Sequence, residues 1–307
     1  MSDTTVSPAP LRPAYADAYA GFHLDQARAR LSGDLETGLN ACVECCDRHC
    51  GANRIALRCL SAGEVLTEYS FEDLRALSAK AANVLRDKGV RPGDVVAGML
   101  PRTVELVALI LGAWRLGAVY QPLFTAFGPK AIQHRLETSR AKLVVTNSAN
   151  RPKLDEVQGC PQIATVRDGE APLAPEDVDF RKALAEASTD FAPVMRKGDD
   201  LFMLMSTSGT TGLPKGVPVP LRALLAFDAY MRDAIDLRDD DVFWNIADPG
   251  WAYGLYYAIC GPLLLGRTTL LYEGGFTADS TFRIVQRMGV TNLAGSPTAY
   301  QIGRASC

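Results

Sequence analysis

The chain has 307 residues, of which 48% are hydrophobic and 22% charged, and its formal net charge is −3 at pH 7. This composition is typical of a soluble globular protein, and a chain of this length begins to divide into subdomains. The weak negative charge provides no basic surface for nucleic acid. The longest uncharged apolar run, residues 106–114, is too short to cross a bilayer. We therefore expect neither a nucleic-acid nor a membrane partner.

Strands and helices are expected to alternate after an N-terminal arm at residues 1–38, which lacks the features of a secretory signal and favours a cytoplasmic location. Ser70 and Asp73 have the spacing of a capping box, and apolar residues at helical spacing follow as far as Gly89. Strands are expected at residues 54–59, 95–100, 118–122 and 142–146, a further strand is expected to end at Tyr69, and helices are expected at 104–115 and 129–139. Such alternation predicts an α/β fold with a mostly parallel sheet.

Residues 167–199 are rich in Asp, Glu, Pro and Ala and contain one short helical patch at 180–187, so we interpret them as a linker. The elements expected beyond it are strands at 201–205, 241–246, 268–272 and 290–294, extended chain at 216–220, and helices at 221–235 and 278–288. We predict one α/β subdomain at residues 39–190 and a second at 191–307. His134 lies on the polar side of its predicted helix, where a solvated surface position is expected.

A cluster of thiols and one imidazole lies between residues 42 and 50, namely Cys42, Cys45, Cys46, His49 and Cys50. Such a group could hold zinc. The same residues also have helical spacing on one face, and cysteine is often buried as a small apolar residue. No second pair at a zinc-finger spacing follows, so we predict core packing and no bound metal.

The most informative stretch follows the apolar strand predicted at 201–205. It consists almost wholly of Ser, Thr and Gly before Pro214 and Lys215: Ser206, Thr207, Ser208, Gly209, Thr210, Thr211, Gly212 and Leu213. Glycines let the backbone approach a ligand, hydroxyls and free N–H groups donate hydrogen bonds, and a lysine supplies a charge suited to phosphate. The pattern therefore predicts a polyphosphate-binding loop. Its glycine and lysine spacing differs from that of a Walker A loop.

This stretch resembles the phosphate loop of the adenylate-forming (ANL) superfamily, whose pattern is Ser/Thr-Ser-Gly-Thr-Thr-Gly-x-Pro-Lys-Gly. Residues 64–85 and 113–146 also resemble the first and second core blocks of that family, and the Asp248-x-Gly-Trp251 segment is similar to its acyl-CoA synthetase branch. The resemblance implies the N-terminal domain of that fold, with two intertwined subdomains. It also implies a short- or medium-chain acid–thiol ligase that uses ATP, Mg²⁺ and CoA.

The resemblance assigns roles to individual residues. Lys215, Thr210 and Thr211 are expected to be catalytic, the loop from Ser206 to Lys215 to hold ATP, and Thr211 to meet Mg²⁺. Trp251 is expected to close the pocket near the carboxylate of a small-molecule acid. The alternative for this residue is a buried aromatic at a strand–helix junction. Ala252 and Tyr253 would line the acyl pocket. Phe124, Phe127 and Gly128 would line the CoA entrance, and Arg151 or Lys153 would meet the CoA phosphates.

Family members continue well beyond Thr298, and the part absent from this sequence holds a magnesium-binding glutamate, a ribose-binding aspartate and the lid with its lysine. The resemblance therefore implies a fragment with half the ATP site, inactive alone and prone to self-association through its truncated edge. Two alternatives remain open, namely an adenylation enzyme that loads a carrier protein and a nucleotide-binding module without turnover.

Overall fold

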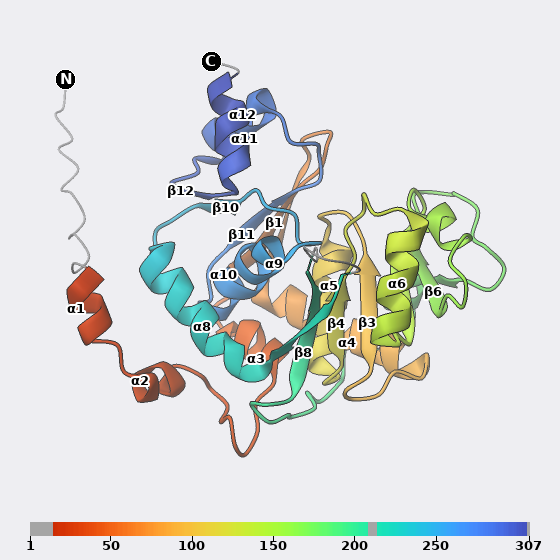
Figure 1. The fold of residues 1–307 in the computed structure, drawn as a ribbon, viewed down its shortest axis with the longest axis horizontal. Coiled ribbons are helices and arrows are strands. Elements are labelled where there is room, and N and C mark those ends of the chain that lie inside the picture. Colours follow the sequence, from red (N-terminus) through yellow and green to blue (C-terminus); the bar gives the residue numbers. More distant parts are fainter. Residues whose placement is uncertain (1–14, 208–213, 306–307) are drawn as a thin grey trace.

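Two sheets organise the structure, a computed structural model that describes residues 15–207 and 214–305 (Figure 1). The larger sheet has the strand order β7-β6-β5-β3-β4-β8-β9, and the smaller has the order β12-β10-β11-β1-β2. Among the described strands, antiparallel pairing within these sheets is limited to β8 with β9 and β1 with β2. The mostly parallel α/β fold predicted from the sequence is therefore confirmed.

The strand boundaries lie close to the expected ones, apart from two strands that were not predicted. The strands of the larger sheet are β3 (Val95–Met99), β4 (Val119–Pro122), β5 (Leu143–Asn147), β6 (Gln162–Val166), β7 (Val178–Asp179), β8 (Leu201–Ser206) and β9 (Gly216–Pro220). Those of the smaller sheet are β1 (Ile55–Leu60), β2 (Leu66–Ser70), β10 (Phe243–Asn245), β11 (Thr269–Tyr272) and β12 (Asn292–Ala294). The sequence did not predict β6 and β7.

The long helices begin and end close to the predicted residues, because each has a clear apolar periodicity and a recognisable first turn. Ser70 and Asp73 form the predicted capping box of α4. The helices are α1 (Tyr15–Ala20), α2 (Leu24–Ala29), α3 (Ala41–Cys45), α4 (Phe71–Asp87), α5 (Val104–Arg115), α6 (Pro129–Ser139), α7 (Phe180–Glu186), α8 (Leu224–Ala229), α9 (Ala252–Gly254), α10 (Gly261–Leu264), α11 (Ala278–Met288) and α12 (Pro297–Ala305). Within the described residues, none is long and apolar enough to cross a membrane.

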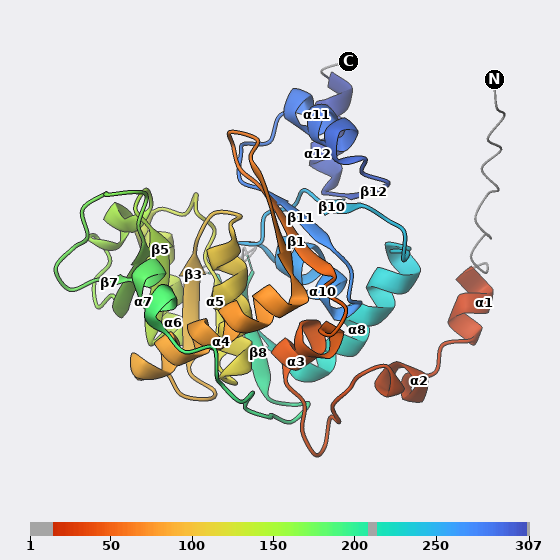
Figure 2. The same cartoon turned by 180° about the vertical axis from the view of Figure 1, so that it is seen from behind.

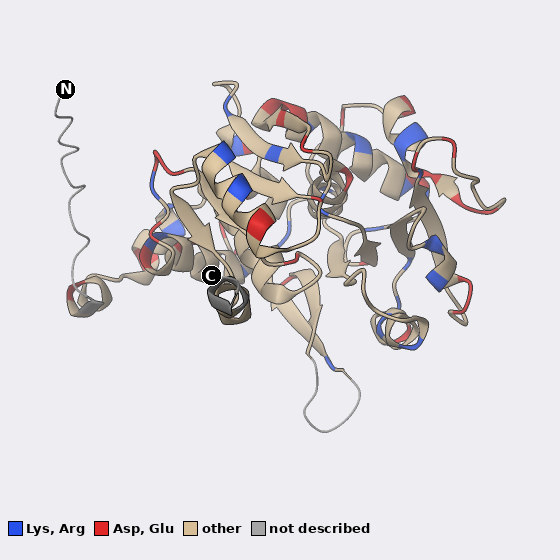
Figure 3. Cartoon of the chain, turned by 90° about the horizontal axis from the view of Figure 1, so that it is seen from above, with Lys and Arg blue, Asp and Glu red and all other residues tan. Residues whose placement is uncertain are grey.

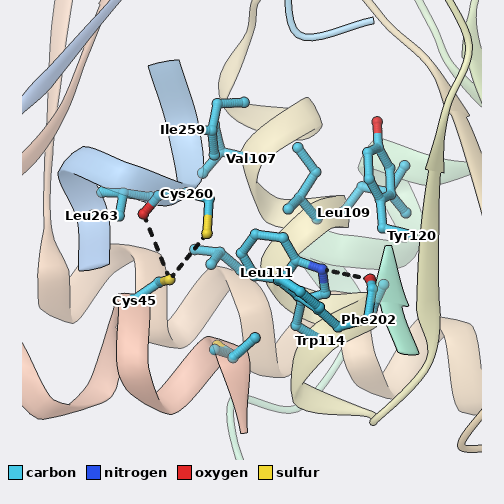
Figure 4. Packing of buried hydrophobic residues seen from close by; sticks show 14 of the residues in the cluster. Cys45, Val107, Leu109, Leu111, Trp114, Tyr120, Phe202, Ile259, Cys260 and Leu263 are labelled. Carbon is cyan, nitrogen blue, oxygen red and sulfur yellow. Dashed lines mark hydrogen bonds between the residues drawn. The ribbon is translucent and has the colours of Figure 1, made fainter. Parts of the chain in front are cut away.

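The larger sheet is covered on both faces. Figure 1 shows α6 in front of it, and the reverse view in Figure 2 shows α4 and α7 on the other side. Helices α4 and α5 pack closely, since a Cβ atom on Gly112 would lie 2.4 Å from Cβ of Ala81. The Trp114 side chain is 1% exposed and donates its indole N–H to the carbonyl of Phe202 in β8, at 3.0 Å (Figure 4). This packing fixes β8, and with it the start of the predicted phosphate loop.

Each sheet takes strands from both sides of the predicted subdomain boundary at residue 190. Strands β8 and β9 extend the sheet formed by β3 to β7, whereas β1 and β2 join the sheet that contains β10 to β12. The chain therefore passes between the two sheets more than once. The division into units at 39–190 and 191–307 stays a prediction.

Residues 167–199 are more ordered than the predicted linker, and that interpretation is wrong in its central part. Strand β7 pairs with β6, and α7 follows with Asp179 as its N-cap. Phe180 is fully buried in the main core. The helical patch expected at 180–187 corresponds to α7. The acidic and proline-rich composition concealed β7, which is too short to show an alternating pattern.

The predicted cysteine cluster is packed in the core, as expected. Cys42, Cys45 and Cys46 are fully buried, and the sulfur of Cys45 lies 3.9 Å from that of Cys260 in the neighbouring helical segment (Figure 4). Among the described residues, no three His, Cys, Asp or Glu side chains come together in a way that could hold a metal. That the cluster binds no metal stays a prediction.

Candidate functional site

The predicted phosphate loop connects β8 to β9, so the hairpin register decides which of its ends face each other. Ser206 pairs with Gly216, and the N–H of Thr207 donates to the carbonyl of Lys215 at 3.0 Å. Both described ends of the loop are therefore held together by backbone pairing. Ser208, Gly209, Thr210, Thr211 and Gly212 lie outside the described residues, so their predicted roles stay predictions.

Lys215 is exposed at the end of this loop. In the described part of the chain, its ammonium group forms no ion pair, whereas most described arginines pair with an Asp or Glu. Most described lysines likewise lack a carboxylate partner, and basic and acidic residues are interspersed over the chain (Figure 3), so the distinguishing feature of Lys215 is its position at the end of the loop. Such a cation suits an anionic ligand.

His134 contacts the same loop end, which corrects its predicted position on the solvated surface. Its side chain is half-buried on α6, and Nε2 lies 2.8 Å from the carbonyl oxygen of Pro214. In the tautomer with a proton on Nε2, the ring donates to that carbonyl. The histidine thereby ties α6 to the residue that directly precedes Lys215.

A second group of residues forms an aromatic cluster, which we define as Phe124, Phe127 and Trp251. The ring centroids of Phe124 and Phe127 lie 5.6 Å and 5.4 Å from that of Trp251, and 5.7 Å from each other. The sequence assigned Trp251 to the acid pocket and the two phenylalanines to the CoA entrance, and the structure brings all three together. Trp251 is 38% exposed, so it is not the buried aromatic of the alternative interpretation.

Two glycines let the segment that carries Trp251 approach its surroundings. A Cβ atom on Gly250 would lie 2.7 Å from Cα of Phe124, and one on Gly254 would lie 2.1 Å from the carbonyl oxygen of Asp248. Neither position has room for a larger residue without backbone movement. The sequence Asp248-Pro-Gly-Trp251 therefore places the indole beside Phe124 because the glycine permits close backbone contact.

Arg102, in the loop after β3, holds this segment in place by hydrogen bonds. The sequence did not predict it as a site residue. Its Nη2 donates to the Asp248 carboxylate at 3.1 Å, and its Nη1 donates to the carbonyl of Tyr272 at 3.1 Å. The other Asp248 oxygen accepts the N–H of Gly250 at 2.7 Å. Its position directly after the predicted strand at 95–100 could have indicated it, because the residues after the carboxyl ends of parallel strands commonly form ligand sites.

The two residues after Trp251 are half-buried at the start of the helical segment formed by residues 252–264. Ala252 packs against the main core, and Tyr253 makes an edge contact with Tyr257 at 5.3 Å between centroids. Burial and the neighbouring Tyr230 hydroxyl raise the pKa of Tyr253, so its phenol stays protonated at neutral pH. Tyr253 is thus an uncharged residue in an aromatic surrounding, and its predicted place in the acyl pocket stays a prediction.

The predicted CoA contacts differ in their surroundings. Gly128 is the exposed N-cap residue of α6. Arg151 donates to Asp177 and to Asp155 at 2.6 Å each, and these hydrogen bonds raise its pKa. Two carboxylates thus already compensate its charge. Lys153 donates to the carbonyl of Thr125, which lies between the two phenylalanines of the aromatic cluster in sequence. Contact of either residue with CoA stays a prediction.

Comparison with known proteins agrees with the sequence resemblance. The chain is 35% identical to the acetyl-coenzyme A synthetase of Bacillus subtilis over 94% of its own length and 51% of that protein. It is 32% identical to that of Syntrophus aciditrophicus, over 85% of this chain and 44% of the relative. A crystal structure of a Brucella canis acyl-CoA synthetase matches with a TM-score of 0.93 and 64% identity, over 95% of this chain and 54% of that one.

The chain thus spans about half the length of the relatives that it matches. A family model described as AMP-binding enzyme matches residues 45–304, which include the phosphate loop, the aromatic cluster and Arg102. By this match and by the similarity to the synthetases, the chain belongs to the family of AMP-binding enzymes.

Proposed function

We propose that the protein is an AMP-forming acyl-CoA synthetase acting on a short- or medium-chain carboxylic acid. The acid attacks the α-phosphate of ATP to give an acyl adenylate and pyrophosphate, and the thiol of CoA then displaces AMP to give the thioester. The observation that carries the proposal is that two features meet around α6. The predicted phosphate loop ends beside Lys215 and contacts His134 on α6, and the half-exposed aromatic cluster includes Phe127 in the turn that precedes this helix. The relatives named above support the same chemistry.

We propose the following roles from the charge of Lys215, the hydroxyl groups of the loop and the position of Trp251. Lys215 and the hydroxyls of Ser206, Thr207 and Thr210 hold the phosphates and stabilise the negative charge that passes to pyrophosphate as the bond breaks. Bound Mg²⁺ supplies further neutralisation of the triphosphate, and the hydroxyl of Thr211 is the oxygen ligand that this loop offers it. The indole of Trp251 covers the acid.

The decisive experiment uses the complete protein with ATP, Mg²⁺ and a series of acids from two to eight carbons. Acid-dependent exchange of labelled pyrophosphate into ATP is expected, followed by thioester formation when CoA is added. Failure of every acid to support exchange would overturn the proposal. If exchange occurs but the acyl group is transferred to a carrier protein and not to CoA, the protein is an adenylation enzyme that loads a carrier protein.

Acid length is expected to depend on Tyr253, because a bulky ring at this position would shorten the proposed acyl pocket. Replacement of Tyr253 by Ala should shift kcat/KM towards longer acids, since each additional buried methylene contributes about 0.8 kcal/mol. The ranking of acids in the variant is compared with the ranking in the unchanged protein. Identical rankings would remove Tyr253 from the pocket.

Self-association is proposed at β12. This strand is an edge of the smaller sheet in the described part of the structure, where it pairs only with β10. The carbonyl of Leu293 already accepts the Tyr300 hydroxyl at 3.0 Å, and the other outer backbone groups can pair with a further strand. Light scattering across a concentration series checks this, and a mass that stays monomeric at every concentration would contradict it.

A further inference from the structure

Arg135 on α6 is a buried cation with few polar partners. Arg135 is 5% exposed, and its Nη1 donates to the carbonyl of Ala131 at 2.8 Å. Its Nε is buried without a hydrogen-bond partner, and among the described residues no carboxylate forms an ion pair with it. Burial lowers the pKa of this guanidinium. A buried charge normally costs several kcal/mol unless a compensating group faces it.

The compensating group here is an aromatic ring. The guanidinium carbon of Arg135 lies 4.1 Å from the centroid of Phe127, well inside the range for a cation–π contact. Such contacts are strongest when the cation is desolvated and no carboxylate competes for it. The attraction acts on both partners, so it also holds the half-buried Phe127 ring in one orientation.

Phe127 in turn contacts the ring that the proposed function assigns to the acid pocket. Its ring and that of Trp251 meet edge to face, with an interplanar angle of 82°. Trp251 is 38% exposed, so its own burial fixes it less firmly than the core fixes Trp114. The orientation of the indole therefore depends on the rings beside it.

We propose that Arg135 is a positioning residue that sets the orientation of Trp251 through Phe127. The catalytic consequence rests on the proposed function, namely that Trp251 lines the acid pocket. Because His134 next to it contacts the phosphate loop, α6 holds both halves of the candidate site from adjacent residues. Among the described residues, Arg135 contacts Ala131 and Phe127 and forms no hydrogen bond or ion pair with the loop end at Pro214 or Lys215.

The first test needs no ligand and no turnover. The chain has three tryptophans, and two of them, Trp114 and Trp244, are 1% and 4% exposed, so acrylamide quenches mainly Trp251. Arg135→Met keeps an unbranched side chain without the charge. In this variant, the ratio of molecules whose Trp251 indole is packed against Phe127 to those in which it is not should fall about tenfold. Quenching should rise accordingly, and Arg135→Lys should fall between the two because an ammonium group also attracts the ring.

Two controls make the result specific. Lys130→Met removes a positive charge from an exposed position on the same helix and should leave quenching unchanged. Adding Arg135→Met to Trp251→Phe should produce no further change in quenching, since the reporter is gone. Wild-type quenching in Arg135→Met would overturn the proposal. If that variant does not fold, wild-type quenching in Phe127→Leu, which lacks the aromatic face, would overturn it instead.

The second test uses the complete protein after pyrophosphate exchange has been measured. Arg135→Met should raise KM for the acid and leave KM for ATP unchanged, because Arg135 contacts Phe127, which contacts Trp251, and neither contact involves the phosphate loop. An equal rise in both constants would indicate general damage and contradict the positioning role. Absence of exchange in the unchanged protein would refute the proposed function alone, since the quenching result does not depend on it.

Discussion

Lys215 differs from the many arginines of this chain in that no described carboxylate compensates its charge. Its backbone is fixed by Thr207 and its preceding residue by His134, whereas its side chain extends into solvent. A solvated lysine contributes little to stability, so this residue should matter for ligand binding and not for folding.

Replacement of Lys215 by Ala should lower the rate of pyrophosphate exchange in the complete protein by about 10²–10³-fold, the usual effect of losing one charge-assisted contact in the transition state. Lys130→Ala, an exposed lysine on α6, is the matched control and should keep the rate. Thermal unfolding of both variants should resemble that of the unchanged protein. Exchange at the normal rate in the Lys215 variant would show that the loop acts without it.

His134 should affect binding of ATP selectively, because its hydrogen bond ends on the backbone of the loop. His134→Phe removes one hydrogen bond and should raise KM for ATP by roughly 3–10-fold, while His134→Gln keeps a donor and should recover most of the loss. KM for the acid is the internal control. A rise in KM for the acid without a change for ATP would contradict this assignment.

These two residues also mark how far sequence reasoning reaches at this scale. Lys215 was predictable because its loop has a pattern of residue types that few other structures need. His134 was not, because its partner is a backbone carbonyl 80 positions away. Contacts to the backbone depend on where the chain passes and leave no mark on the sequence of either segment.

At the scale of elements, the loop after β3 and the turn after β10 are joined through Arg102 and Asp248. Strand β3 belongs to the larger sheet and β10 to the smaller one, so this pair links the two sheets next to the aromatic cluster. Both side chains are about one quarter exposed, at 22% and 26%, which reduces the free energy that the ion pair contributes.

Arg102→Met should therefore destabilise the protein by only about 1–2 kcal/mol, including the hydrogen bonds lost to backbone carbonyls. It should also free the Asp248 turn and increase quenching of Trp251 fluorescence. A double-mutant cycle with Asp248→Asn measures the coupling between the two side chains, which we expect to be about 1 kcal/mol. Additive effects in that cycle would show that the pair does not link the loops.

The elements themselves were predicted unevenly, for a physical reason. Helices α4, α5, α6 and α11 are long enough for their apolar periodicity to be read, and their boundaries match. Strand β7 is only a two-residue element stabilised by its neighbour β6, and the sequence gives no local indication of it. The order of strands in each sheet depends on long-range pairing and was beyond the sequence pattern.

At the scale of the whole molecule, His49 lies where the N-terminal segment meets the helical segment before β11. Its ring contacts Phe71 at 5.2 Å between centroids, and Nε2 lies 3.1 Å from the carbonyl of Leu264. A Cβ atom on Gly266 would lie 2.6 Å from Nδ1, so the imidazole fills a closely fitted space. Burial, assisted by the nearby Arg48, lowers the pKa of His49 from 6.5 to about 4.

This shift predicts a loss of stability in mild acid. Because the pKa is about 4 in the folded state and 6.5 in the unfolded state, the unfolded chain binds more protons between these values, and stability falls as pH decreases through that window. The contribution of this single group is at most about 1.4 kcal/mol per pH unit. It is absent above pH 6.5 and stops growing below pH 4.

His49→Gln isolates the contribution, since the glutamine amide can donate to the carbonyl of Leu264 and accept from Arg48 but does not titrate. Urea unfolding of both proteins at several pH values from 7.5 to 4.5 should show free energies of unfolding that converge or cross as the pH falls, because the unchanged protein loses stability more steeply. Carboxylates titrate in both proteins, and their effect cancels in the difference. If the two curves remain parallel, the imidazole is protonated in the folded protein as readily as in the unfolded chain, and the tight packing around it does not exclude the charged form.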